Sequence, residues 1–165
     1  MHQTARPHIH PTPLTSDVQR DTCAPDVDVA DPFVVTRYRD EFLSWIPGKV
    51  DILFANRTEL ALLAGCKGDD ESVLRCAEHL APTILMKAGA EGSLFLDRGR
   101  LGSSPPVQAK VVDTTGAGDA FAAGYLYGHL AGMGPAEASR LANRVAAGVV
   151  STEGCRYDAV PRGVR

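Results

Sequence analysis

Short apolar runs alternate along this chain with stretches of helical periodicity, and this alternation limits the fold more than any other feature of the sequence. The runs at 50–54, 83–86 and 92–96 are too short for buried helices and are interpreted as strands of a covered sheet. Helical patterns lie at 56–64, 69–80, 118–131 and 135–151. Strands alternating with helices favour an α/β fold with a largely parallel sheet.

Weaker patterns complete this outline. Val27 and Val29 indicate the end of a short strand. Segments 100–101 and 107–112 are expected to be further short strands around Pro105-Pro106. One continuous helix is predicted to begin after Asp31 as N-cap and to end at Pro47-Gly48. Its apolar face is expected to comprise Val34, Val35, Tyr38, Phe42, Trp45 and Ile46.

The composition changes near residue 25. Residues 1–25 contain four prolines and three histidines, and they show neither strand nor helix periodicity. Such a segment buries too little apolar surface to offset the entropy of ordering it. We therefore predict a disordered tail over 1–25 and a folded domain over 26–165.

Charge and apolar patterning exclude several classes of protein. Seventeen Lys and Arg against 20 Asp and Glu give a net charge of −3, which leaves no basic excess to neutralise nucleic-acid phosphates. The longest apolar runs are far below the ~18 residues of a membrane span. The N-terminus has no apolar signal segment, so we predict a cytoplasmic protein that binds neither nucleic acid nor membrane.

The four cysteines, Cys23, Cys66, Cys76 and Cys155, show no zinc-ligand spacing. Reduced thiols are the favoured interpretation in a reducing compartment. A disulfide pair is the less favoured alternative.

The segment 111–121 carries the strongest chemical signal. An apolar stretch enters a loop of small residues, and the loop leads directly into an amphipathic helix. Gly116 and Gly118 expose the backbone N–H groups of Gly116, Ala117 and Gly118 at the positive end of that helix, which is a ready anion site. Asp119 follows at once. It is either an ordinary acid of a first helical turn or a base that takes a proton from a hydroxyl beside the anion, and spacing alone does not decide.

The sequence Asp113-Thr-Thr-Gly-Ala-Gly-Asp119, with Phe121 and Gly124, resembles the second signature of the ribokinase-like (PfkB-type) sugar and nucleoside kinases. The resemblance implies a three-layer α/β/α fold, Asp119 as the catalytic base, and the Gly116–Gly118 amides as the anion hole for the transferred phosphoryl group. It also implies ATP and Mg²⁺ as cofactors. Asp113 and Thr115 match positions that bind a monovalent cation such as K⁺ in many members.

Upstream, Val50 to Glu59 resembles the family's strand followed by Asn-x-x-Glu. There Asn56 and Glu59 would organise Mg²⁺, its waters and the phosphates. The same two residues also form the pattern of a capping box, which needs no metal. The capping box is the favoured interpretation for these residues alone, and the metal role is favoured beside the downstream signature.

Two less specific matches to the family indicate where the nucleotide would bind. Lys87 to Gly92 resembles the family's nucleotide-side turn, where Gly89 and Gly92 would let the backbone approach ATP; a plain hairpin is the alternative. Asn143, Ala146 and Ala147 lie on the helix that borders the adenine pocket in the family. Close helix packing explains those small residues equally well.

The resemblance covers about residues 26–160, the C-terminal half of such a kinase. The N-terminal half and the lid are missing, so we expect a truncated ribokinase-like sheet with one uncovered edge that favours self-association. Residues 26–39 resemble bacterial adenosine kinases, which favours a nucleoside over a sugar as acceptor. The expected function is transfer of the γ-phosphoryl group of ATP to a primary hydroxyl. The alternative is an inactive remnant that binds nucleotide weakly or needs a partner.

Overall fold

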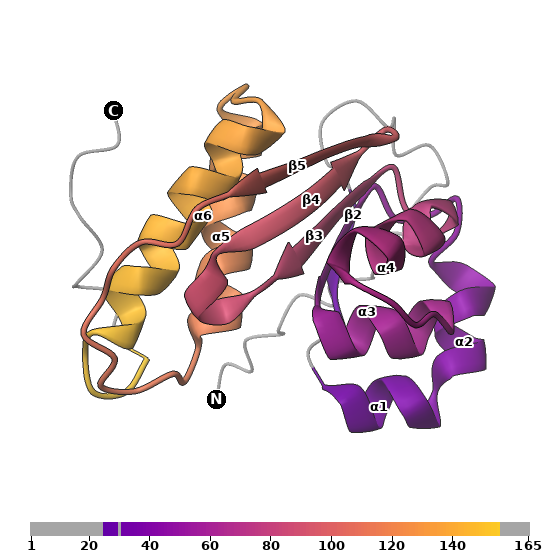
Figure 1. Cartoon of the computed structure of the whole chain (residues 1–165), viewed down its shortest axis with the longest axis horizontal. Helices are drawn as coiled ribbons and strands as arrows, with labels where there is room; N and C mark the ends of the chain where they lie inside the picture. The colour runs from indigo at the N-terminus through magenta and orange to yellow at the C-terminus, as the bar shows by residue number, and fades with distance from the viewer. Residues whose placement is uncertain (1–24, 30, 156–165) are drawn as a thin grey trace, which may run out of the picture.

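The computed structural model describes residues 25–29 and 31–155, which form a five-stranded sheet with helices on both faces (Figure 1). The strands follow the order of the chain: β1 (Asp26–Asp28), β2 (Ile52–Asn56), β3 (Thr83–Lys87), β4 (Ser93–Asp97) and β5 (Arg100–Ser104). The pairs β1–β2 and β2–β3 are parallel, and β3–β4 and β4–β5 are antiparallel. The sheet is therefore mixed, and the expectation of a largely parallel sheet holds for its first three strands. The predicted tail lies outside the described residues, apart from residue 25.

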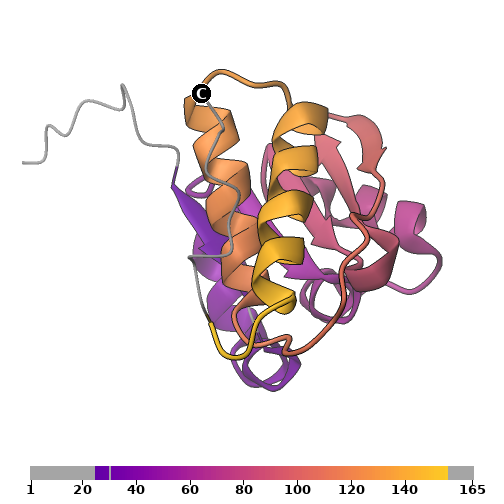
Figure 2. The ribbon, with the colours of Figure 1, turned by 90° about the vertical axis from the view of Figure 1, so that its left-hand side faces the viewer.

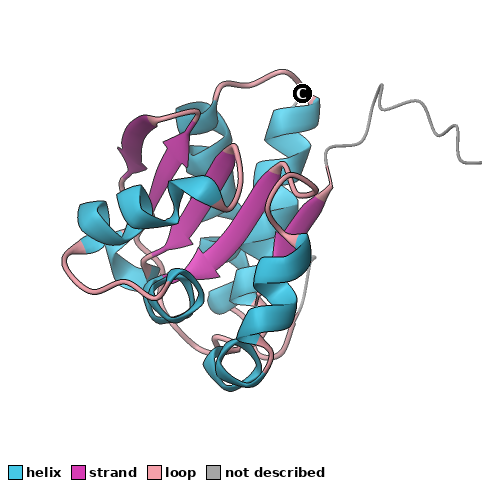
Figure 3. Cartoon of the chain, turned by 90° about the vertical axis from the view of Figure 1, so that its right-hand side faces the viewer, coloured by secondary structure: helices cyan, strands magenta, loops and turns pink. Residues whose placement is uncertain are grey.

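Helices cover the two faces of the sheet in two groups. One face carries α1 (Pro32–Arg37), α2 (Arg39–Trp45), α3 (Arg57–Ala64) and α4 (Asp70–Cys76), which leads into the 3-10 turn η1 (Ala77–His79) (Figure 3). The other face carries α5 (Ala117–Leu130) and α6 (Pro135–Val150), which lie side by side (Figure 2). The three expected α/β/α layers are present. In the described part of the chain, no helix combines the length and apolar character needed to cross a membrane.

Alternation along the central strands divides the core between the two faces. Successive strand side chains point to opposite faces of a sheet. Accordingly Leu53, Ala55 and Ile84 pack with the buried residues of α3 and α4. Ile52, Phe54 and Leu85 pack instead with Phe121 and Tyr125 of α5. The same alternation decides which polar residues at the strand ends face α5.

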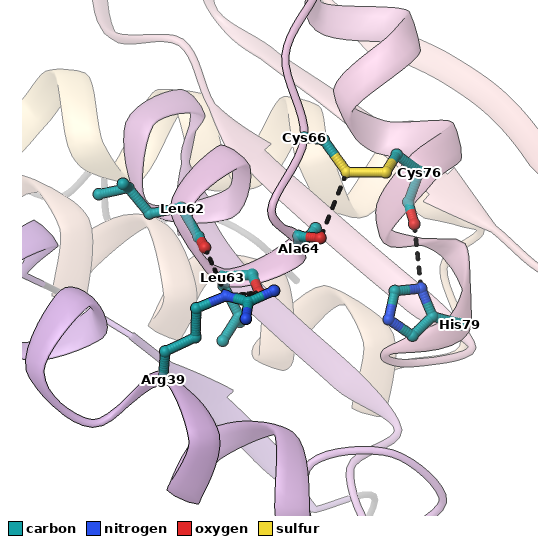
Figure 4. Close-up of a disulfide and its surroundings, with 7 residues drawn as sticks. All are labelled: Arg39, Leu62, Leu63, Ala64, Cys66, Cys76 and His79. Atoms are coloured by element: carbon teal, nitrogen blue, oxygen red, sulfur yellow. Dashed lines mark hydrogen bonds between the residues drawn. A yellow bond between two sulfur atoms is a disulfide. The ribbon is translucent and has the colours of Figure 1, made fainter.

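The helix predicted between Asp31 and Pro47 is two helices, so that prediction was wrong in part. Asp31 is the N-cap, and its Oδ1 accepts from the Phe33 N–H at 2.6 Å. The chain leaves helical geometry at Tyr38 and starts again as α2. Of the expected apolar face only Val35 and Ile46 are buried. The break lets Arg39 turn toward α3, where its Nε donates to the carbonyl oxygens of Leu62 and Leu63, each at 3.0 Å (Figure 4).

The strand predicted at 107–112 does not form. Pro105 and Pro106 end β5, because proline has no N–H to donate to a neighbouring strand. Val111 and Val112 remain mostly exposed, at 65% and 52%. The Val112 N–H donates instead to the carbonyl oxygen of Val150 at 2.8 Å, at the end of α6. The segment thus runs along α6 as an irregular wall (Figure 2).

Cys66 and Cys76 form a disulfide, which corrects the expectation of reduced thiols for this pair (Figure 4). Gly65 ends α3 in the left-handed conformation, and this turn places Cys66 against the last residue of α4, with a Cα–Cα distance of 6.4 Å. Cys155 is free and exposed, and Cys23 lies outside the described residues. The disulfide closes a short loop that joins α3 to α4.

We expect the double variant Cys66→Ser, Cys76→Ser to lose about 3 kcal/mol of unfolding free energy, because the cross-link restricts the unfolded chain. For a domain of this size that loss lowers the melting temperature by about 6–12 °C. Thermal melts with and without reductant measure it. Reductant should lower the wild-type midpoint and leave the double variant unchanged; a wild-type midpoint insensitive to reductant would contradict the prediction.

Candidate functional site

A cavity of about 600 Å³ opens between the β3–β4 hairpin, the segment after β5, and helices α5 and α6. It brings together residues that the sequence predicted for the nucleotide and the anion. These are Lys87, Gly89, Gly92, Ala117, Gly118, Asn143, Ala146 and Ala147. Other predicted residues, namely Asn56, Glu59, Asp113, Thr115, Gly116 and Asp119, are not among the residues that line it. Most of the remaining lining is apolar, including Val107, Phe121 and Val150.

The start of α5 is a glycine turn in which one of the three predicted amides is already hydrogen-bonded. Gly116 is the N-cap and has a φ of 77°, a conformation that glycine adopts without strain. The Ala117 N–H donates to the Thr114 carbonyl oxygen at 3.2 Å, within its own loop. The predicted anion hole therefore depends on the Gly116 and Gly118 amides. Asp119 follows in the first turn of α5 with its side chain exposed.

Gly92 is required for the floor of the cavity. Its φ is 91°, and a Cβ at this position would lie 2.3 Å from the Ser104 carbonyl oxygen and 2.7 Å from the Pro106 nitrogen. Gly89 has a φ of 57°, and a Cβ at this position would have no other heavy atom within 4 Å. The plain hairpin that was the alternative interpretation is present, because β3 and β4 pair antiparallel across this turn. It also forms one wall of the cavity.

Asn56 and Glu59 form the complete capping box of α3. The Glu59 Oε2 accepts from the Asn56 N–H at 2.7 Å, and its Oε1 accepts from the Asn56 Nδ2 at 2.7 Å. In return the Glu59 N–H donates to the Asn56 Oδ1 at 2.9 Å. The Glu59 side chain is buried, at 2% exposure. The non-metal alternative is therefore what the geometry shows, and whether the pair also supports Mg²⁺ stays a prediction.

No group of three or more His, Cys, Asp or Glu in residues 25–29 and 31–155 is arranged to hold a metal ion. Mg²⁺ commonly keeps several waters and binds through one or two carboxylates together with substrate phosphates. The buried carboxylate of Glu59, whose two oxygens each accept one hydrogen bond from Asn56, fits such a role through water.

Asp113 ties two loops together. Its Oδ1 accepts from the Thr115 N–H at 2.9 Å, and its Oδ2 accepts from the Gly154 N–H at 3.0 Å. The hydrogen bonds from Thr115, and then the one from Gly154, hold the pKa of Asp113 below its ordinary value. Each oxygen accepts one N–H, and whether Asp113 and Thr115 also bind a monovalent cation stays a prediction.

The Asn143 side chain links α6 to the end of β5 and the segment after it by hydrogen bonds. Its side chain is 8% exposed, and its Nδ2 donates to the Ser104 carbonyl oxygen at 3.3 Å and to the Pro105 carbonyl oxygen at 3.0 Å. It therefore shapes the cavity that it was predicted to border. Gly124, the last residue of the sequence signature, allows α5 and α6 to pack closely, because a Cβ there would lie 2.9 Å from the Ala142 Cα.

Sequence reasoning missed one residue of the site, Asp28. Its two carboxylate oxygens lie 2.7 and 2.6 Å from the Lys87 Nζ. The pair joins the ends of β1 and β3 across 59 residues of sequence. Nothing in the local pattern of either segment signals it. The only sequence hint is that Asp28 lies between Val27 and Val29, at the predicted end of a strand, and ligands bind outside the carboxyl ends of strands in open α/β folds.

The layered sheet, the cavity and the glycine loop at the start of α5 define a ribokinase-like α/β protein. Residues 17–162 match the model of the pfkB family carbohydrate kinases, and the chain belongs to that family. It is 41% identical over 113 residues to an uncharacterized sugar kinase of Archaeoglobus fulgidus, covering 68% of this chain and 44% of that protein. It is 33% identical over 116 residues to the ribokinase of Arabidopsis thaliana, covering 64% and 30%.

Solved structures agree with this assignment. The fold matches a probable sugar kinase from Rhizobium etli with a TM-score of 0.75 and 34% identity, covering 79% of this chain and 40% of that one. It matches the adenosine kinase from Sinorhizobium meliloti with a TM-score of 0.74 and 36% identity, with the same coverage of 79% and 40%. The chain thus spans less than half the length of these relatives.

Proposed function

We propose that the chain carries the nucleotide side of an ATP-dependent kinase, which transfers the γ-phosphoryl group of ATP to a primary hydroxyl of a small molecule. The observation that carries the proposal is the cavity of about 600 Å³, whose lining includes Ala117 and Gly118 in the first turn of α5. Its apolar walls suit a base, and the helix start suits phosphates.

Each residue has a distinct role in this proposal. The hairpin at Gly89 and Gly92 and the face of α6 around Asn143 and Ala147 border the nucleotide. The Gly116 and Gly118 amides stabilise the charge that develops on the transferred group. Asp119, exposed beside that loop, takes the proton of the acceptor hydroxyl.

Mg²⁺ bound to the ATP phosphates would offset their charge, and Glu59, positioned by Asn56, would hold it through water. Binding of K⁺ at Asp113 and Thr115 stays a prediction, and no step of the proposed reaction depends on it.

Adenosine is the favoured acceptor, and a sugar is the second candidate. The likeness to the Sinorhizobium meliloti adenosine kinase at 36% identity supports the nucleoside. The likeness to the Archaeoglobus fulgidus sugar kinase at 41% identity supports the sugar. The cytoplasmic location stays a prediction.

A partner-dependent or inactive form is the alternative to an active kinase. The strand β1 stands at the edge of the described sheet, where another strand could pair. In that alternative the chain self-associates or binds nucleotide only weakly.

Saturating Mg·ATP is expected to raise the melting temperature of the protein by about 5–10 °C, since a ligand at about 100 times its dissociation constant adds roughly 2.7 kcal/mol. Differential scanning calorimetry with Mg²⁺ alone as the control measures the shift. A cooperative transition that Mg·ATP leaves unmoved would overturn the nucleotide assignment.

A further inference from the structure

The Lys87–Asp28 ion pair lies on the face of the sheet that α5 covers. Asp28 is in register with Phe54 of β2, and Phe54 is in register with Leu85 of β3. Phe54 and Leu85 both pack against α5, and Lys87 stands two residues after Leu85 on the same face. Its side chain reaches back across the end of β2 to the Asp28 carboxylate, which its Nζ contacts at 2.6 and 2.7 Å. The two side chains are only 17% and 18% exposed.

The ammonium group of Lys87 lies close to the start of α5. Lys87 lines the cavity, and a Cβ at Gly118 would lie 3.3 Å from its Nζ. The positive end of a helix disfavours a nearby cation, so α5 alone would repel this group. The Asp28 carboxylate offsets that repulsion and holds the ammonium in place. An anion in the cavity would meet the lysine charge and the start of α5 together.

We propose that Lys87 binds the phosphates of the nucleotide directly, and that Asp28 is a positioning residue whose carboxylate is the resident counter-ion of Lys87 and competes with those phosphates. This inference rests on the proposed function and adds to it the source of positive charge in the cavity. A point charge of this kind is a common phosphate ligand in proteins.

Lys87→Met tests the ligand role, with the exposed Lys67→Met as the matched control. Calorimetric titration measures binding of Mg·ATP, adenosine and inorganic tripolyphosphate to each protein. We expect Lys87→Met to weaken Mg·ATP and tripolyphosphate at least about tenfold and to leave adenosine unchanged, because charge-assisted hydrogen bonds to phosphate are lost. Lys87→Arg, which keeps the charge, should restore most of the phosphate affinity. Unchanged phosphate affinity in a folded Lys87→Met protein overturns the proposal.

Asp28→Asn tests the counter-ion role, because a competing counter-ion and a purely structural residue predict opposite changes in phosphate affinity. It keeps a hydrogen-bonding oxygen beside Lys87 and removes the competing charge, so tripolyphosphate affinity should rise by about three- to tenfold. A purely structural role of Asp28 predicts weaker binding and a lower melting temperature instead, and that result overturns its assignment as a competing counter-ion.

The outcomes separate this inference from the proposed function. Lys87-dependent binding of tripolyphosphate with no preference for Mg·ATP supports the phosphate site and contradicts the nucleotide assignment. Binding of Mg·ATP that does not depend on Lys87 contradicts the inference and leaves the nucleotide assignment in place. Absence of binding of any of the three probes to the wild-type protein overturns both.

Discussion

Asp119→Asn is expected to lower the rate of phosphoryl transfer by about 10²–10⁴-fold in a preparation that turns over ATP, because a positioned general base contributes about that much. The side chain is exposed in the first turn of α5, directly after Ala117 and Gly118, which line the cavity. Asparagine keeps its size and cannot accept the proton of the acceptor hydroxyl. Steady-state kinetics should show the loss in kcat, while the Mg·ATP-induced rise in melting temperature is retained.

The matched control is Asp40→Asn. Asp40 is also an exposed acid in the first turn of a helix, α2, and no residue of α2 lines the cavity. If Asp119 were only a helix-start acid, both variants would change stability by about 0.3–1 kcal/mol and activity would not fall. Turnover of Asp119→Asn within about threefold of the parent would remove Asp119 from the mechanism.

Phe54→Ala is expected to cost about 3–5 kcal/mol of unfolding free energy, the usual loss for a fully buried phenylalanine. Phe54 has no exposed surface, and its ring meets Phe121 and Tyr125 edge-on, at centroid distances of 6.4 and 5.7 Å. These contacts hold α5 on the sheet. Because Phe121 also lines the cavity, we expect the Mg·ATP-induced rise in melting temperature to shrink as well.

Phe33→Ala is the control for that loss, because the Phe33 side chain is 69% exposed. Surface substitutions of this kind usually change stability by no more than about 0.5 kcal/mol. Urea unfolding of both variants measures the difference. Equal midpoints for the two would show that the contacts between β2 and α5 do not stabilise the fold as argued.

Features that depend on neighbouring residues could be predicted from the sequence. Asp31 and Asn56 each cap the helix that follows, as expected. Gly65 ends α3 in the left-handed conformation. Caps and turns are made within three or four residues, so a local pattern determines them. The glycine loop before α5 belongs to this group, and its match to the family signature extended the prediction from local structure to chemistry.

Only the tertiary structure decided which distant groups meet. The break at Tyr38, the disulfide between Cys66 and Cys76, and the irregular wall at 107–112 each depend on contacts with other elements.

The same holds for the polar groups of the site. The Nδ2 of Asn143 donates to the carbonyl oxygen of Pro105, which lies 38 residues away. Lys87 of β3 forms an ion pair with Asp28 of β1. Such pairs form because strand register and helix packing bring them together, and no period in the sequence encodes them. The sequence by itself thus determined the family, the layers and eight of the residues that line the cavity. The fold determined that the charge in the cavity is a lysine held in place by a carboxylate from the far side of β2.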